Sequence, residues 1–184
     1  MKLLSVSVGL PREVEWNDER VLTSIFKAPV PGRVRVAKLG LEGDQQSDLE
    51  VHGGIEKAVY AYPSEHYAFW RKELPGMQLP PGVFGENLTT EGLLEETLHV
   101  GDRIRAGTAE FVVTEPRMPC YKLAIRFGRA DIVKRFMKSG RTGFYLAVLK
   151  EGEVGAGDAI ELIGADQHRI SVAAVAAAKA RSRH

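Results

Sequence analysis

The sequence predicts a mainly β protein with a few peripheral helices, folded as a closed and mainly antiparallel β-barrel. Short apolar runs recur along the 184 residues, and the 19 glycines fall between them, as strand-and-turn architectures require. Helical periodicity is confined to a few short segments, which do not alternate regularly with the strands. A doubly wound parallel sheet is therefore the second choice.

The strands are predicted from alternating or short apolar segments. In the first of them, Val6 and Val8 alternate with Ser5 and Ser7, the period of a half-buried strand. The segments HVGDRIRAG and GAGDAIELIG resemble each other, because each has a Gly-Asp turn before an alternating run. Two similar hairpins explain this echo, and an ancient barrel repeat is the alternative. The predicted strands cover residues 3–8, 20–25, 57–62, 98–105, 110–114, 144–149 and 159–163.

Helices are predicted at four places. Ser64 can cap the segment SEHYAFWRKEL, whose aromatic residues recur at helical spacing. Short helices over residues 123–127 and 131–138 each end at a glycine. The alanine-rich and basic end of the chain favours helix over strand. Since no linker or low-complexity tract divides the chain, we expect one domain over residues 1–165 and a short helical or frayed tail over residues 166–184.

The composition argues against several classes of protein. The chain has one cysteine, 25 basic residues and 24 acidic residues. A single thiol cannot close an internal disulfide or supply a four-cysteine zinc site. The near-neutral charge argues against a nucleic-acid-binding module. No apolar run is long enough to span a bilayer, and the first ten residues are better explained as a strand than as a signal peptide. We therefore expect a soluble, cytoplasmic protein that binds neither nucleic acid nor membrane.

The segment TEPRMPCYKL contains the strongest candidate for chemistry. Cys120 follows Pro119 at the start of a predicted helix, with Arg117 three residues before it and Lys122 two residues after it. A helix start and two neighbouring cations favour the thiolate, so the sequence predicts a lowered pKa for the thiol. A nucleophile, a sulfur carrier or a soft-metal ligand requires such a thiolate. A buried and inert cysteine is the alternative.

Two further segments contain candidate anion-binding groups. In GDQQSDLEVHGGIEK, the amides of Gly53 and Gly54 can face an anion, and Lys57 adds a positive charge. His52 stands directly before them, as a ligand, a base or a hydrogen-bonded structural residue. The glycine pair can equally be a simple turn. Arg141 lies between two glycines, as an anion clamp or as an exposed turn residue.

The segment VFGENLTTEGL combines aromatic, flexible and polar residues. Phe84, Gly85, Glu86 and Asn87 could hold a planar heterocycle by stacking and hydrogen bonding, although a capped turn is an equal alternative. The sequence has no HExxH, CxxC, GxSxG or GxGxxG motif, which argues against zinc hydrolases, serine hydrolases and dinucleotide-binding enzymes. The remaining candidate for an active site is one activated cysteine sulfur, surrounded by anion-binding elements.

Taken in order, these segments resemble a MOSC domain of the YiiM type. The resemblance rests on GDQQSDLEVHGG with EKAVYAYP, FGENLTTEGL, GDRIRAGTAEFVVTEPRMPCYKL and GRTGFYLAVLKEGEVGAGDAIEL, and it covers residues 1–165. It implies a β-barrel that binds the molybdenum cofactor, a molybdopterin with an anionic phosphate. It also implies that Cys120 carries sulfur or coordinates molybdenum. The other positions it matches are His52, Gly53, Gly54, Lys57, Phe84, Gly85, Glu86 and Asn87, with Arg117, Lys122 and Arg141 as cofactor-side cations.

The same resemblance implies an activity. Some MOSC proteins reduce N-hydroxylated compounds, such as hydroxylaminopurines and amidoximes, with electrons from a separate redox protein. We therefore expect a molybdenum-dependent oxidoreductase in which Cys120 is a metal ligand. The alternative is a non-enzymatic carrier of sulfur or of the cofactor, with a Cys120 persulfide loaded by a sulfur-donor protein. An anion-binding barrel with an inert cysteine is the third possibility. YiiM-type proteins commonly continue into a C-terminal helical region after the barrel, and the tail of this chain is short, so the resemblance supports cofactor binding more strongly than catalytic turnover.

Overall fold

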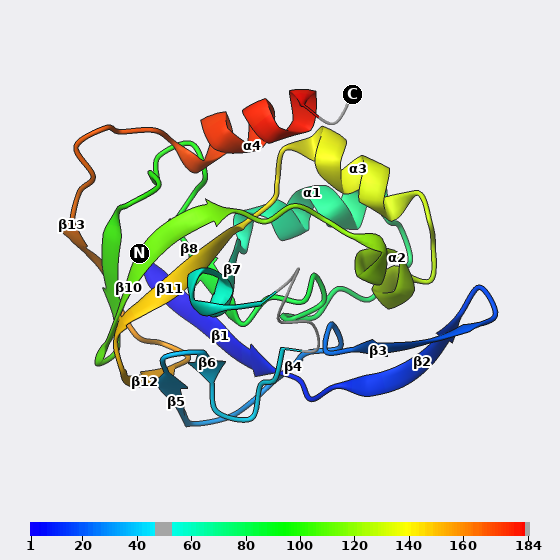
Figure 1. Ribbon diagram of the computed structural model, residues 1–184, viewed down its shortest axis with the longest axis horizontal. Coiled ribbons are helices and arrows are strands. Elements are labelled where there is room, and N and C mark those ends of the chain that lie inside the picture. The colour runs from blue at the N-terminus through cyan, green and yellow to red at the C-terminus, as the bar shows by residue number, and fades with distance from the viewer. Residues whose placement is uncertain (47–52, 183–184) are drawn as a thin grey trace.

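Strands make up most of the regular structure, with short helices gathered on one side (Figure 1). The computed structural model describes residues 1–46 and 53–182. The strands are β1 (Lys2–Val8), β2 (Arg12–Trp16), β3 (Glu19–Thr23), β4 (Ala28–Pro29), β5 (Arg33–Ala37), β6 (Gly40–Leu41), β7 (Val59–Pro63), β8 (Leu88–Glu91), β9 (Arg103–Ala106), β10 (Ala109–Pro116), β11 (Phe144–Lys150), β12 (Gly152–Gly155) and β13 (Ile160–Gly164). The helices are the 3-10 helix η1 (Ile55–Lys57), α1 (Glu65–Glu73), α2 (Tyr121–Phe127), α3 (Ile132–Ser139) and α4 (Val172–Arg181).

The main sheet is open, so the predicted closed barrel is wrong. Its eight strands follow the order β13-β9-β10-β11-β7-β8-β1-β4, and all neighbours are antiparallel except β7 and β8. In the described part of the chain no ladder joins the edge strands β13 and β4. A single bridge between Lys2 and Ala159 links the start of β1 to the residue before β13. The mainly β, mainly antiparallel character of the prediction is confirmed.

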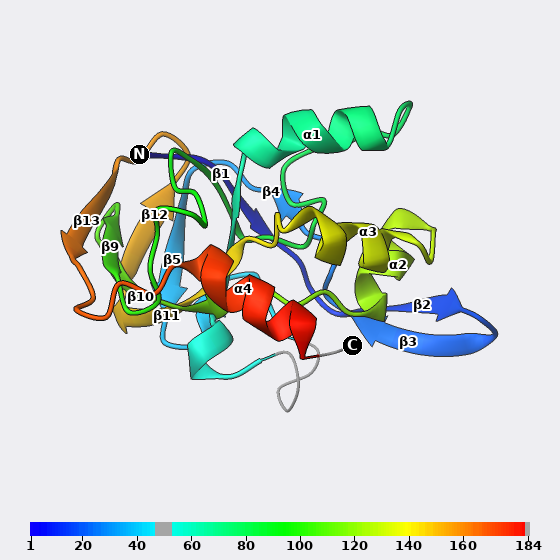
Figure 2. The same ribbon diagram turned by 90° about the horizontal axis from the view of Figure 1, so that it is seen from above.

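Some strands do not belong to the main sheet, which explains why the abundance of short strands wrongly predicted a closed barrel. Strands β12, β5 and β6 form a separate small sheet, and β2 and β3 form a hairpin that projects from the body (Figures 1 and 2). Asn17 and Asp18 make the turn of this hairpin with φ angles of 52° and 64°, a left-handed conformation that these two residue types tolerate. Strand partners depend on contacts distant in sequence, which alternation alone does not specify.

The helices cover an aromatic part of the core. Phe84 and Trp70 are fully buried there, among side chains from α1, α2, α3 and β7. The ring of Phe84 stacks on Tyr62 with centroids 4.6 Å apart, and Trp70 Nε1 donates a hydrogen bond of 2.7 Å to the Tyr62 hydroxyl. The helices predicted around residues 65, 123 and 131 are all present. As predicted, α2 and α3 each end at a glycine, and both glycines are left-handed.

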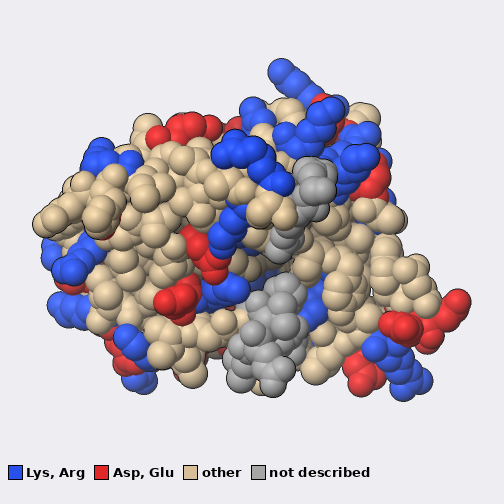
Figure 3. Space-filling view, turned by 45° about the horizontal axis from the view of Figure 1, so that its top comes forward, with Lys and Arg blue, Asp and Glu red and all other residues tan. Residues whose placement is uncertain are grey.

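The alanine-rich end of the chain forms α4, which packs back on the body. Ser171 caps this helix by accepting a hydrogen bond of 3.2 Å from the Ala174 amide, and Val172 is fully buried. Lys179 pairs with Glu115 of β10. Lys and Arg side chains gather on this side of the molecule, over α3 and the end of α4 (Figure 3). No helix in residues 1–46 and 53–182 has the length and apolar character of a membrane span.

Candidate functional site

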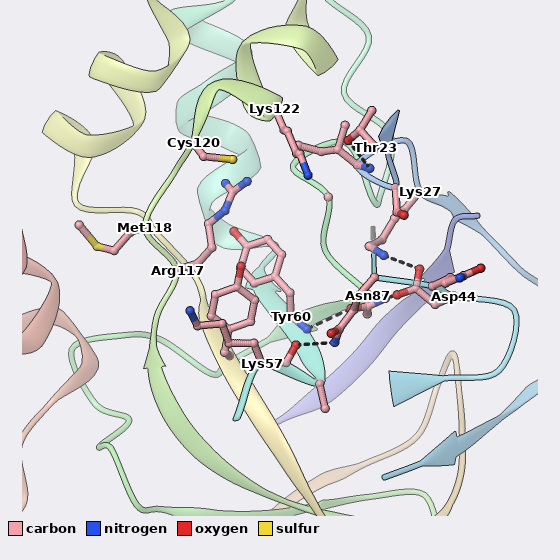
Figure 4. A pocket seen from close by; sticks show the side chains of 17 residues that line it. Thr23, Lys27, Asp44, Lys57, Tyr60, Asn87, Arg117, Met118, Cys120 and Lys122 are labelled. Atoms are coloured by element: carbon pink, nitrogen blue, oxygen red, sulfur yellow. Dashed lines mark hydrogen bonds and ion pairs between the residues drawn. The ribbon is translucent and has the colours of Figure 1, made fainter. Parts of the chain in front are cut away.

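A cavity of about 110 Å³ lies beside Cys120, where the β10–α2 connection faces the N-terminal half of the chain (Figure 4). Segments distant in sequence meet around it. They are the loop after β3, the residues around Asp44, the η1–β7 junction, the loop before β8, the β10–α2 connection and the start of β11. The residues labelled in Figure 4 are Thr23, Lys27, Asp44, Lys57, Tyr60, Asn87, Arg117, Met118, Cys120 and Lys122, and all of them line the cavity.

The conformation of the β10–α2 connection places Cys120. Pro116 is the last residue of β10, and Cys120 occupies the N-cap position of α2 with an extended backbone. The thiol is partly exposed, and it makes no capping hydrogen bond. Helix α2 has only seven residues, so we assign the charge environment of the thiol to Arg117 and Lys122 rather than to a helix dipole. Both side chains point toward the same part of the cavity as Cys120 (Figure 4).

Arg117 is a buried cation with unused hydrogen-bonding capacity. Its guanidinium lies 5.2 Å from the centres of the Tyr60 and Phe136 rings, and the residue is 6% exposed. Burial lowers its pKa, but Tyr60, Tyr145 and Cys120 together raise it above the usual value, so the side chain stays charged. Nη1 is buried and has no hydrogen-bond partner among the described residues. A buried N–H of this kind is available to a ligand or to a water molecule.

Two tyrosines form the wall next to Arg117. The rings of Tyr60 and Tyr145 lie 5.4 Å apart, and the Tyr60 hydroxyl donates a hydrogen bond of 2.8 Å to the Thr142 carbonyl. Burial raises the pKa of both phenols, and the positive charge of Arg117 only partly opposes this shift. Both hydroxyls therefore remain protonated at neutral pH. They act as neutral, hydrogen-bonding groups beside the cation.

The opposite wall is held by a buried ion pair that the sequence did not predict. Lys27 and Asp44 pair with side chains only 9% and 6% exposed. The Asp44 carboxylate also accepts hydrogen bonds from the Gly9 amide at 2.8 Å and from Asn87 Nδ2 at 3.0 Å. Burial lowers the pKa of Lys27, and Asp44 opposes this shift. Asn87 continues the network by accepting a hydrogen bond of 3.0 Å from the Tyr60 amide.

The structure brings half of the sequence-predicted site residues to this cavity. The ones that line it are Lys57, Gly85, Asn87, Arg117, Cys120 and Lys122. Lys57 also faces Glu115, with Nζ 3.5 Å from the carboxylate. Lys27, Tyr60 and Tyr145 were missed, because nothing in their local sequence marks them. Asp44 stands in the polar loop before the glycine pair, which was the one available signal.

Phe84 and Glu86 are buried and do not line the cavity. Phe84 belongs to the aromatic core, so its ring is not available for stacking on a ligand. Glu86 accepts hydrogen bonds from the Gly82 and Phe84 amides at 2.8 and 3.0 Å, from Thr89 Oγ1 at 3.1 Å, and from the Tyr67 hydroxyl. Burial raises its pKa, and these hydrogen bonds oppose the shift. Glu86 therefore organises the loop that presents Gly85 and Asn87.

The remaining predicted residues lie elsewhere. Gly54 has a φ of 94° and donates a hydrogen bond of 2.9 Å to Gln46, and neither Gly53 nor Gly54 lines the cavity. The Arg141 guanidinium lies 4.1 Å from the centre of the Phe69 ring and lines a different cleft. His52 lies outside the described residues.

The described residues contain no cluster of three or more His, Cys, Asp or Glu side chains that could hold a metal ion. Cys120 is thus a single soft donor in a cationic cavity. A protein thiolate in this setting can supply one ligand to a metal that arrives with its other ligands. The same thiolate can act as a nucleophile or carry a second sulfur atom.

Comparison with known proteins assigns the family. The MOSC domain model matches residues 48–161. The chain is 42% identical over 170 residues to the uncharacterized protein YflK of Bacillus subtilis, covering 92% of this chain and 76% of that protein. It is 40% identical over 143 residues to YiiM of Escherichia coli, covering 77% of this chain and 64% of that protein.

Other matches agree. A protein named reductase from Gibberella moniliformis is 35% identical over 164 residues, covering 88% of this chain but only 29% of the fungal protein. The crystal structure of YiiM from Geobacillus stearothermophilus superposes with a TM-score of 0.82 at 34% identity, covering 99% of this chain and 85% of that one. The order of the motifs, the matched model and these relatives show that the chain belongs to the MOSC domain family.

Proposed function

We propose that this MOSC protein binds the molybdenum cofactor in the Cys120 cavity and reduces N-hydroxylated small molecules there. The observation that carries the proposal is the convergence of Cys120, Lys122 and Arg117 in one cavity, with a buried Arg117 N–H that has no partner in the described part of the chain. Family membership supports the cofactor, and the relative named reductase supports the reaction class.

The residues present fit this cofactor chemically. A thiolate is a soft ligand suited to molybdenum, and Arg117 and Lys122 suit its anionic groups. The absence of a protein metal cluster among the described residues fits a metal that brings other ligands with it. A cavity of about 110 Å³ is smaller than the roughly 300–1,000 Å³ of sites for drug-sized ligands. It would therefore enclose only one end of the cofactor.

Each wall of the cavity has a distinct role in this proposal. Cys120 binds the metal, and Arg117 stays charged and places its unused N–H toward an anionic group. Tyr60 and Tyr145 exclude water from this cation and keep their protons. The Lys27–Asp44 pair fixes the opposite wall through Asn87. When bound, the cofactor supplies the two-electron redox chemistry.

The proposed reaction requires a separate electron donor. Conversion of an N–OH group to N–H breaks the N–O bond, consumes two electrons and two protons, and releases water. The described residues include no second thiol and no metal cluster that could store these electrons. We therefore propose a reduced redox protein as the partner, whereas the carrier alternative requires a sulfur donor instead.

Cofactor binding is tested by purifying the protein from a host that makes the cofactor. We expect molybdenum and a fluorescent pterin in equimolar amounts with the protein. Cys120→Ser should lose most of the molybdenum, and Arg117→Gln should lose both. Arg126→Gln is the matched control, because Arg126 also has a buried nitrogen without a partner in the described chain but does not line the cavity. A wild-type protein free of molybdenum and pterin would overturn the proposal.

A second experiment separates the enzyme from the carrier. The loaded protein is given dithionite-reduced methyl viologen and an amidoxime, and the amidine product is measured by chromatography. We expect product to form with the wild type and not with Cys120→Ser. Loaded protein that forms no product, but transfers labelled sulfur or cofactor to an acceptor, would instead establish the carrier. The partly exposed thiol is compatible with either role.

A further inference from the structure

A second hollow with a mixed polar and apolar lining lies apart from the Cys120 cavity. It is a cleft of about 890 Å³ between α1, the α3–β11 connection and α4. Its volume falls within the roughly 300–1,000 Å³ of small-molecule sites. Met118 lines both hollows, and its side chain points away from Cys120 (Figure 4). The β10–α2 connection thus separates the two.

The polar wall of the cleft is held in place by buried contacts. His66 Nε2 lies 2.7 Å from the Glu95 carboxylate, and both side chains are almost completely buried. The same carboxylate accepts a hydrogen bond of 2.7 Å from the Gly143 amide. These contacts tie α1 to the end of the α3–β11 connection, which carries Arg141. The Tyr62 hydroxyl adds a hydrogen bond of 3.2 Å to the Arg141 carbonyl.

Arg141 is presented to the cleft by two contacts. Nη1 donates a hydrogen bond of 3.1 Å to the Ser139 carbonyl, and the guanidinium lies 4.1 Å from the centre of the Phe69 ring. A guanidinium has five N–H donors. The two contacts therefore fix its position and leave further donors for a ligand. Phe69 is itself only partly buried and forms part of the cleft.

The remaining lining combines positive charge with an apolar floor. Lys138 and Arg181 add to the charge of Arg141, and Figure 3 shows Lys and Arg side chains gathered over this region. Glu65 and Glu96 also line the cleft. One oxygen of the Glu65 carboxylate already has a partner, because it accepts a hydrogen bond of 2.6 Å from the Gly92 amide. The floor consists of Leu94, Met118, Met137 and four alanines of α4.

We infer that this cleft is a second ligand site, which binds a small molecule with a flat apolar body and one anionic group. The body lies on the methionine and alanine side chains, and the carboxylate, sulfonate or phosphate of the ligand pairs with Arg141. This site is independent of the cofactor proposed for the Cys120 cavity. It uses the predicted anion clamp Arg141, but at a different place in the molecule.

The test uses 1-anilinonaphthalene-8-sulfonate, a fluorescent aromatic anion, with the full chain. We expect saturable binding at one site and about tenfold weaker binding to Arg141→Gln, the size expected for losing one charge-assisted hydrogen bond. The same substitution should change the affinity for the uncharged analogue N-phenyl-1-naphthylamine by less than about twofold, since this dye lacks the sulfonate. Arg20→Gln, an exposed arginine in the β2–β3 hairpin, is the matched control and should bind as the wild type does.

A second pair of variants guards against misfolding of Arg141→Gln. Ala177 and Ala174 are both exposed on α4, but only Ala177 lines the cleft. Ala177→Trp should fill the cleft and abolish binding of the dye, whereas Ala174→Trp should not. Displacement of the dye by benzoate would identify a carboxylate ligand, and displacement by AMP a phosphate ligand. Equal dye binding by the two tryptophan variants, or unchanged binding by Arg141→Gln, would overturn the inference.

Discussion

Replacing Asp44 by asparagine should destabilise the protein more than any exposed charge substitution. Asp44 and Lys27 are almost completely buried, so Asp44→Asn leaves the Lys27 ammonium without its counter-charge. Breaking a buried pair from one side costs about 3–5 kcal/mol. That is a large fraction of the roughly 5–15 kcal/mol that stabilises a domain. Urea unfolding followed by the fluorescence of Trp16 and Trp70 measures the loss.

The double-variant cycle shows whether pairing is the cause. Lys27→Met should cost less, on the order of 2 kcal/mol, because the Asp44 carboxylate keeps its hydrogen bonds from Gly9 and Asn87. The double variant should then cost at least about 1 kcal/mol less than the sum of the two single losses. Asp131→Asn, which breaks an exposed ion pair with Arg129, is the control and should change stability little. Additive losses at Asp44 and Lys27 would refute the pairing argument.

Two further predictions concern Glu86 and Gly143, which do not line the cavity. The pKa of Glu86 is raised above 4.5, so the folded state holds its proton more tightly and the wild type loses stability as pH rises from 4.5. The loss of unfolding free energy caused by Glu86→Gln, measured with urea, should therefore become smaller from acidic to neutral pH. A loss that becomes larger over this range would contradict the prediction. Gly143→Ala should cost more than about 3 kcal/mol, because φ is +62° and the new Cβ would meet the Ala61 carbonyl at 2.5 Å. The control Gly128→Ala, with φ +64° and open space, should cost about 1–2 kcal/mol in the same assay.

Features that depend on neighbouring residues could be predicted from the sequence. The glycine ends of α2 and α3 follow from the left-handed conformation that glycine adopts most easily. Cys120, Arg117 and Lys122 meet because they lie within one short connection. Strand β5 carried the same kind of signal in its alternation of Val34 and Val36 with arginine, but it was overlooked.

Features that depend on distant contacts could not be predicted. Strand β8 buries Thr89 and Thr90, so it lacks the apolar pattern by which strands are identified. Lys27 enters the cavity only because β4 pairs with β1 and brings the loop after β3 over Asp44. The open sheet has the same origin, since the pairing of strands at its edges is set by packing and not by alternation.

More cations than carboxylates line the cavity among the described residues, and their effect can be measured at the thiol. Lys27, Lys57, Arg117 and Lys122 line the cavity with Asp44 as the one carboxylate among the described lining residues. In an enclosed space with apolar walls such charges raise the local concentration of anions.

Anionic iodoacetate should therefore alkylate the Cys120 thiol faster, relative to neutral iodoacetamide, than it alkylates free cysteine, by on the order of tenfold at low salt. Added salt should reduce this ratio, because it screens the cations at the open side of the cavity. Arg117→Gln should reduce the ratio as well, whereas Arg126→Gln, outside the cavity, should not. A ratio equal to that of free cysteine at low salt would show that the cations do not act on the thiol, and it would remove the electrostatic basis for an anionic cofactor at this site.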